Sequence, residues 1–244
     1  MELSKNTILI TGGGSGIGLA LARAFALHGN TVIVCGRNSK KLEAMHNDNP
    51  AIVTLPCDIA IDQEQQSLVE NLTQSYPSLN VLINNAGIQH NYPFDDKQSH
   101  TALIEEEMNI NFLAPAKLTD RFLPFLLKQP TAAVVNVSSA LAVVPKQSAP
   151  IYCATKAAMH NFTKALRYQL EKTPVKVFEI IPAMVDTEMT KGRGKNKISP
   201  EDLAVEALQG LASDRFEIRI GKTKILFFLH RLIPFLAERI IRNG

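Results

Sequence analysis

Tyr152 and Lys156 lie four residues apart in the segment Ile-Tyr-Cys-Ala-Thr-Lys-Ala-Ala. On a helix, residues at this spacing share one face, so an ammonium could stabilise a neighbouring phenolate and lower the tyrosine pKa from its ordinary value of about 10. A tyrosine tuned in this way can act as a general acid or base near neutral pH. The pair alone is ambiguous, because a half-buried tyrosine beside a lysine is common on amphipathic helices.

A glycine-rich segment, Thr-Gly-Gly-Gly-Ser-Gly-Ile-Gly, follows a short apolar run and opens a helical pattern. In an open α/β sheet, the first strand-to-helix turn offers backbone N–H groups and a helix N-terminus to a pyrophosphate. A side chain at its tight positions would block the bend or the approach of the phosphates. The spacing GxxxGxG differs from GxGxxG, but the context is that of the motif. The segment predicts a dinucleotide site formed by Gly12, Ser15, Gly16, Ile17 and Gly18.

The end of the second apolar run bears on the choice of nicotinamide cofactor. NAD is held by an acid on its ribose about 20 residues after the glycines, whereas the 2′-phosphate of NADP needs a cation. No carboxylate lies between Gly18 and Glu43, and this run ends in Arg37 and Asn38. A guanidinium suits phosphate, so NADP(H) is favoured over NAD(H), although Arg37 could be a plain surface charge. Asp58 could bind the adenine amino group or simply cap its own turn.

Short β-branched runs alternate with longer helical patterns along the whole chain. This alternation predicts a parallel sheet covered by helices on both faces, hence a doubly wound seven-stranded α/β fold of Rossmann type in a single domain, residues 1–244. The expected strands are Thr7–Ile10, Thr31–Cys35, Ile52–Pro56, Val81–Ile83, Ala133–Val137, Val175–Ile181 and Glu217–Ile220.

Two further segments are distinguished by their composition. Ser199, followed by proline and two acids, is typical of a helix start. Residues 183–198 contain a polar, glycine-bearing stretch without apolar periodicity, which we expect to be a mobile substrate lid, with an ordinary solvated loop as the alternative.

Taken together, these motifs resemble the short-chain dehydrogenase/reductase superfamily in order and spacing. The resemblance rests on the glycine segment, Asn84-Asn85-Ala86-Gly87, Asn111, Ser138-Ser139 and Tyr152-x-x-x-Lys156, and it covers residues 5 to about 190. Within the superfamily, Cys35–Asn38, Asn111–Pro115, Tyr152–Ala158 and Pro182–Thr187 are similar to the DltE-like bacterial oxidoreductases.

The resemblance implies a role for each matching residue. Tyr152 would protonate the carbonyl oxygen, Lys156 would lower its pKa and hold the nicotinamide ribose, and Ser139 would polarise the carbonyl. Asn111 would hold a water that connects Lys156 to solvent. Asn85, Ala86 and Gly87 would lie along the cofactor, and Thr187 would bind the nicotinamide carboxamide. Ala142 and Ala183 stand where the family commonly has glycine, which puts the local geometry of those loops in question.

The composition fits one globular domain, with 45% hydrophobic and 20% charged residues in a chain of 244. The net charge of +3 is concentrated in residues 221–244, so the remainder is nearly neutral and no nucleic-acid partner is expected. Three cysteines without metal-binding spacing indicate no metal and fit a reducing cytosol. No signal peptide or transmembrane run is evident, so we expect a cytoplasmic protein.

The basic, amphipathic segment of residues 221–244 has three possible roles. Its helically spaced apolar residues could pack on the core or a subunit interface, cover the substrate cleft, or dock on an anionic membrane surface. The resemblance implies a homodimer or homotetramer. The expected function is NADP-dependent hydride transfer to or from a small carbonyl or alcohol; a non-catalytic NADP(H) sensor or scaffold is the alternative.

Overall fold

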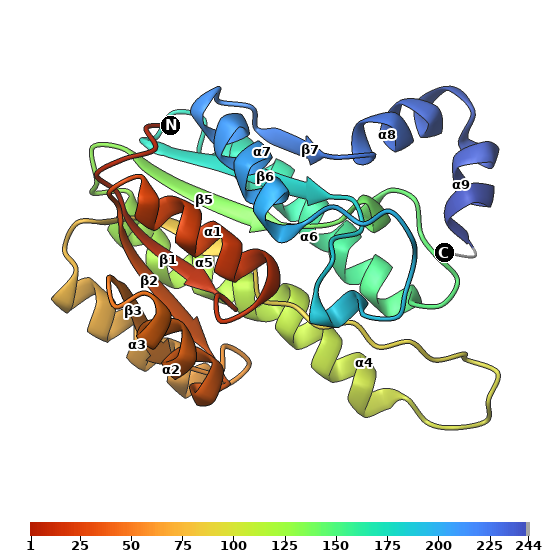
Figure 1. Cartoon of the computed structure of the whole chain (residues 1–244), viewed down its shortest axis with the longest axis horizontal. Helices are drawn as coiled ribbons and strands as arrows, with labels where there is room; N and C mark the ends of the chain where they lie inside the picture. Colours follow the sequence, from red (N-terminus) through yellow and green to blue (C-terminus); the bar gives the residue numbers. More distant parts are fainter. Residues whose placement is uncertain (243–244) are drawn as a thin grey trace.

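Seven parallel strands form one sheet in the computed structural model, which describes residues 1–242. Their order across the sheet is β3-β2-β1-β4-β5-β6-β7 (Figure 1). The predicted strands are confirmed to within two residues at each end, and the central strands are apolar runs suited to burial on both faces. The bounds are β1 (Thr7–Thr11), β2 (Thr31–Gly36), β3 (Ile52–Pro56), β4 (Leu79–Asn84), β5 (Ala132–Val137), β6 (Val175–Pro182) and β7 (Glu217–Ile220).

Helices cover both faces of the sheet. Alternate residues of β1 belong to different cores: Ile8 and Ile10 pack with α1, α2 and α7, whereas Leu9 packs with α3, α5 and α6. The fold is therefore doubly wound and of Rossmann type, as predicted. The helices are α1 (Gly16–Leu27), α2 (Ser39–Asp48), α3 (Asp62–Ser75), α4 (Thr101–Met108), α5 (Ala114–Leu126), α6 (Pro150–Gln169), α7 (Pro200–Ala212), α8 (Thr223–Leu232) and α9 (Pro234–Arg242).

Three short helical turns lie close to the carboxyl edge of the sheet. A π-helical turn, η1 (Asn109–Leu113), joins α4 to α5, and two 3-10 turns, η2 (Ala140–Ala142) and η3 (Glu188–Thr190), follow β5 and β6. π-Helical turns are rare and are frequent at functional sites. These turns carry residues that the sequence assigns to the site.

The expected helix start at Ser199 is confirmed. Ser199 caps α7, since its hydroxyl accepts a hydrogen bond from the backbone N–H of Asp202 at 3.0 Å. The C-terminal segment forms two helices, α8 and α9, the second of which begins at Pro234. Residues 243 and 244, the last of the predicted basic segment, lie outside the described residues. Among residues 1–242, no helix has the length and apolar character that a membrane span requires.

Candidate active site

The loops after β1 and β4 meet where the strand order of the sheet reverses. Thr11, the last residue of β1, holds them together: its hydroxyl oxygen accepts hydrogen bonds from the backbone N–H groups of Asn85 and Ala86, both at 3.1 Å. The Asn85 side chain donates in return to the carbonyl oxygens of Thr11 at 3.0 Å and Gly12 at 3.2 Å. Ligands of open α/β sheets bind in the crevice at such a reversal.

The glycines of the first turn keep this crevice open. Gly12 and Gly16 have φ of +65° and +52°, which residues with side chains rarely adopt. A Cβ at Gly18 would lie 2.5 Å from both the Asn85 amide nitrogen and the Gly12 carbonyl oxygen. The turn therefore requires glycine for backbone and steric reasons.

The N-terminus of α1 is suited to an anion. Ser15 lies in extended conformation at the N-cap, its hydroxyl makes no capping hydrogen bond, and the first turn, which contains Ile17, carries no acid. The backbone N–H groups of this turn and the positive end of the helix dipole favour a phosphate there. The residues present fit the pyrophosphate of a dinucleotide.

The residues proposed for the adenosine end lie at the ends of β2 and β3. Arg37 is 56% exposed, and its guanidinium lies 3.6 Å from the Glu106 carboxylate. Asn38 caps α2, since its side-chain oxygen accepts from the Lys41 N–H at 3.0 Å. Asp58 accepts from the Ala60 N–H at 2.9 Å, so it stabilises its own turn. A cap of its own turn was the alternative given for Asp58, and the cofactor roles of these three residues remain predictions.

Ser139, Tyr152 and Lys156 are brought together where β5 meets α6. Ser139 caps η2, with its hydroxyl oxygen accepting from the Leu141 N–H at 3.1 Å, and the Ser139 hydroxyl lies near enough to the Tyr152 hydroxyl to affect its pKa. The Lys156 ammonium nitrogen donates to the Val137 carbonyl at 2.8 Å and lies 5.6 Å from the Tyr152 ring centroid. Two hydroxyls and an amine thus lie beside the crevice.

The pKa of Tyr152 is not lowered overall, contrary to what its pairing with Lys156 predicts. Burial raises the pKa of Tyr152 to about 12, and the Ser139 hydroxyl opposes this rise. Burial also lowers the pKa of Lys156 to about 8, opposed by the charge of Glu179. Low-dielectric surroundings disfavour the charged form of each group. The geometry of the pair was predictable from its spacing; the desolvation was not.

Asn111 lies in η1 and holds the loop after β4 through its side chain. Its amide oxygen accepts from the Ile88 N–H at 2.8 Å, and its amide nitrogen donates to the Ile88 carbonyl at 2.9 Å and to Thr155 at 3.2 Å. A Cβ at Gly87 would approach the Asn111 oxygen to 3.2 Å and the Lys156 nitrogen to 3.7 Å. Asn111 therefore connects the β4 loop to the helix that carries Lys156; its water-holding role remains a prediction.

The sequence reasoning missed a buried acid near these residues. Glu107 is 0% exposed, accepts from the His90 N–H at 3.2 Å, and has one carboxylate oxygen without a partner among the described residues. Burial raises the pKa of Glu107, and its charge in turn raises the pKa of Tyr152. The signal was available, because Glu107 precedes Asn111 by four residues and so shares its helix face. Residues 1–242 contain no group of three or more His, Cys, Asp or Glu that could hold a metal ion.

The segment of residues 183–198 folds back over the glycine turn. The Thr187 methyl group lies 3.0 Å from the position of a Cβ on Gly16, and Lys41 of α2 pairs with Glu188. Val185 forms a parallel bridge with Ile198. Thr187 is thus placed beside the dinucleotide crevice, while the mobility of this segment remains a prediction.

Two residues next to the site are buried. Cys153 is 4% exposed, so its thiol is a buried helix group. Ser138 is 2% exposed and faces the interior, unlike Ser139.

Comparison with known proteins agrees with this arrangement. The sequence model of the short chain dehydrogenase family matches residues 6–198. The chain is 43% identical over 224 residues, 89% of each chain, to the uncharacterized oxidoreductase DltE of Bacillus subtilis strain 168. A short chain dehydrogenase from Burkholderia cenocepacia J2315, solved in complex with NADP, is similar over 100% of both chains, with a TM-score of 0.88 and 23% identity.

A second solved structure holds the other nicotinamide. A short chain dehydrogenase/reductase from Burkholderia phymatum, in complex with NAD, has a TM-score of 0.85 and 20% identity, and the match covers 100% of this chain and 97% of that chain. The two structures support the fold, and the family match spans the glycine turn as well as Ser139, Tyr152 and Lys156. The chain therefore belongs to the short-chain dehydrogenase/reductase family of oxidoreductases and is similar to DltE.

Proposed function

We propose that the protein is an NADP-dependent oxidoreductase that acts on a carbonyl compound or the corresponding secondary alcohol. The observation that carries this proposal is the grouping of Ser139, Tyr152 and Lys156 beside a crevice that only glycines keep open. A nucleotide sensor or scaffold has no need of a proton donor next to such a crevice.

The side chains divide the chemistry between them. A bound nicotinamide supplies or accepts the hydride. With a pKa of about 12, Tyr152 is protonated at neutral pH and can give its proton to a carbonyl oxygen that gains charge. Ser139 can donate a hydrogen bond to the same oxygen. Lys156 is held by the Val137 carbonyl within reach of the phenol and supplies positive charge below a pH of about 8.

The preference for NADP rests on the end of β2. The Arg37 guanidinium lies at the surface directly before α2, and Asn38 caps that helix, so a phosphate there would meet both a cation and a helix N-terminus. Relatives of known structure include an NADP and an NAD complex, and this chain has an arginine at the deciding position.

Substitution of Arg37 tests the choice of cofactor. Arg37→Glu is expected to weaken NADPH binding by about tenfold or more, since it exchanges a phosphate-binding cation for a repelling charge, and to leave NADH binding nearly unchanged. Both constants are measured by nucleotide fluorescence titration. Equal losses for the two nucleotides would refute the phosphate role of Arg37.

Substitution of Tyr152 tests the reaction itself. Tyr152→Phe is expected to lower turnover of a carbonyl panel by about 10²–10⁴-fold while NADPH affinity is unchanged, because only the proton donor is removed. Oxidation of NADPH is followed by absorbance. Tyr168→Phe is the matched control, since Tyr168 lies on the same helix and is 65% exposed. If Tyr152→Phe turned over like Tyr168→Phe, the assigned proton donor would be wrong.

A further inference from the structure

The two C-terminal helices form an arm, residues 222–242, beyond the carboxyl end of β7 (Figure 1). Its inner side packs on the body: Thr223 and Ala237 are buried, and the Arg242 carbonyl accepts from the Gln147 N–H at 3.0 Å. The outer side carries seven large apolar residues that are 36–70% exposed, namely Ile225, Phe228, Leu232, Ile233, Phe235, Leu236 and Ile240. Packing of the whole apolar face on the protein's own core is therefore wrong.

The exposed apolar residues of the arm belong together. Ile225, Phe228 and Leu232 follow helical spacing on α8, and Leu232 leads directly into the exposed Ile233 and Phe235 at the junction with α9. Soluble monomers rarely expose apolar patches larger than roughly 300–600 Å², and larger ones mark an interaction surface. The arm is such a surface.

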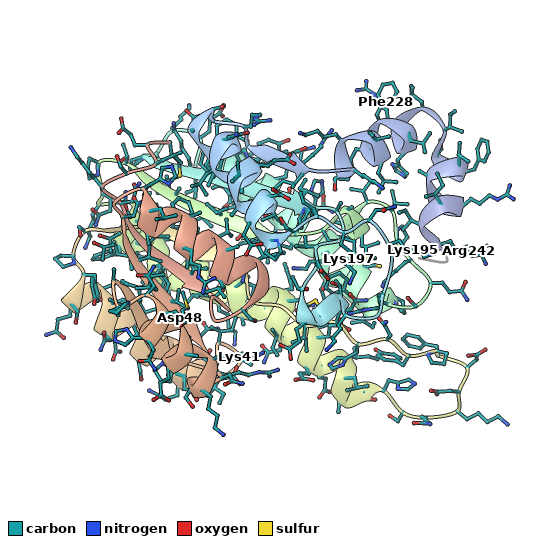
Figure 2. The ribbon with its side chains drawn as sticks, viewed as in Figure 1. Lys41, Asp48, Lys195, Lys197, Phe228 and Arg242 are labelled. Atoms are coloured by element: carbon teal, nitrogen blue, oxygen red, sulfur yellow. The ribbon has the colours of Figure 1, made fainter. Side chains whose placement is uncertain are left out.

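Cations flank this apolar face. Lys222, Arg231, Arg239 and Arg242 are exposed and make no ion pair within residues 1–242, while Glu238 is the arm's single acid. Figure 2 shows Phe228 at the outer side of α8. The arm thus combines exposed aromatic and aliphatic side chains with uncompensated positive charge.

We propose that this arm docks the protein on the surface of an anionic lipid bilayer. Amphipathic helices with Phe and Leu on one side and Lys and Arg around it lie in the bilayer interface, where apolar burial and attraction to anionic headgroups add together. Each cation near such a surface contributes to binding, and the contribution is screened by salt. The two helices lie on the surface and do not span it.

Charge decides between a bilayer and a second copy of the chain. In a twofold interface formed by this face, the cations of one arm would be buried against a second arm that has the same excess of cations and Glu238 as its single acid. An anionic bilayer is complementary both to the exposed apolar side chains and to the cations of this face. The cleft-covering role does not account for the outer side, because it is the inner side that contacts the loop after Ser139.

The test is sedimentation of the full chain with lipid vesicles. Wild type is expected to sediment with vesicles of phosphatidylcholine containing phosphatidylglycerol, far less with phosphatidylcholine alone, and less as salt is raised. Phe228→Ser with Phe235→Ser, and separately Arg231→Gln with Arg239→Gln, are each expected to weaken partitioning by about tenfold or more. All four side chains are exposed, so the fold should survive; thermal melts followed by circular dichroism check this.

Matched controls remove the same chemistry elsewhere on the surface. Leu27→Ser with Tyr168→Ser removes apolar side chains that are 86% and 65% exposed, and Lys128→Gln with Lys172→Gln removes two exposed cations. Both controls should partition like wild type. The proposal is overturned if wild type sediments with neither vesicle, or if the controls lose as much binding as the arm variants. It is also overturned if the arm substitutions dissociate an oligomer in analytical ultracentrifugation while wild type ignores the anionic vesicles.

Discussion

Gly18→Ala tests the reasoning about the dinucleotide crevice, because a single methyl group would intrude at its narrowest point. The added carbon would lie 2.5 Å from the Asn85 amide nitrogen and from the Gly12 carbonyl oxygen, so the backbone or the Asn85 side chain must move. Overpacking of this kind costs about 1–3 kcal/mol. Loss of a hydrogen bond between Asn85 and the turn adds about 1 kcal/mol, and the better helix propensity of alanine returns a similar amount. We expect a net loss of about 1–3 kcal/mol in unfolding free energy.

The same displacement should impair nucleotide binding more than it impairs folding. Asn85 connects the glycine turn to the loop after β4, so its movement disturbs both walls of the crevice. Gly18→Ala should therefore weaken NADPH binding by at least about tenfold, since a shift of about 1 kcal/mol or more is amplified where phosphate contacts backbone. Urea unfolding and fluorescence titration measure the two effects.

Gly14→Ala is the control within the same turn. A Cβ at Gly14 would meet Leu42 and Lys41 at 3.5 Å, an ordinary contact distance, and Gly14 has no positive φ. The free energy of unfolding of this variant should lie within about 0.5 kcal/mol of that of wild type. If Gly18→Ala bound nucleotide and unfolded like Gly14→Ala, the crevice would not depend on close packing between the turn and Asn85.

Three further predictions follow from polar contacts. Glu106→Gln should raise NADPH affinity up to about fivefold and leave NADH unaffected in titrations, because it frees Arg37 from an exposed ion pair worth about 0–1 kcal/mol. Thr11→Val should lower the urea unfolding free energy by about 1–3 kcal/mol, since two backbone N–H groups lose their acceptor. His160 bonds the buried Glu179 at 2.9 Å, and this hydrogen bond raises the pKa of His160. The stabilisation from this bond is therefore complete below the unfolded histidine pKa of about 6.5 and is lost as pH rises through the folded pKa. We therefore expect His160→Gln to lower the free energy of unfolding more at about pH 6 than at alkaline pH.

The sheet was predictable because most of its strands are short runs rich in β-branched and other apolar residues. Such runs suit parallel strands buried on both faces, and the helical segments between them fix the crossovers. The glycine turn was equally predictable, because a turn of this kind excludes side chains for local steric reasons. Tyr152 and Lys156 share a helix, so their spacing alone placed them together.

Other features depend on contacts between distant segments. The ion pair of Arg37 with Glu106 joins the end of β2 to α4, and nothing in either local sequence indicates it. In the sequence Glu107 is one more acid on a polar helix. Its burial depends on the loop after β4, which covers it. The C-terminal arm has the periodicity of a core-packed helix, and only its position beyond β7 shows that the apolar side is exposed.

Desolvation shifts the pKa values of Tyr152 and Lys156 in directions opposite to those that attraction between their charges would give. If the ammonium dominated, the phenol would ionise near neutral pH and serve equally as acid or base. Burial instead raises one pKa to about 12 and lowers the other to about 8, so between neutrality and a pH of about 8 the pair holds both protons. In that state Tyr152 holds a proton that it can donate, but the raised pKa also makes the phenol a weaker acid. Burial therefore fixes the resting protonation state of the pair and does not favour reduction over oxidation.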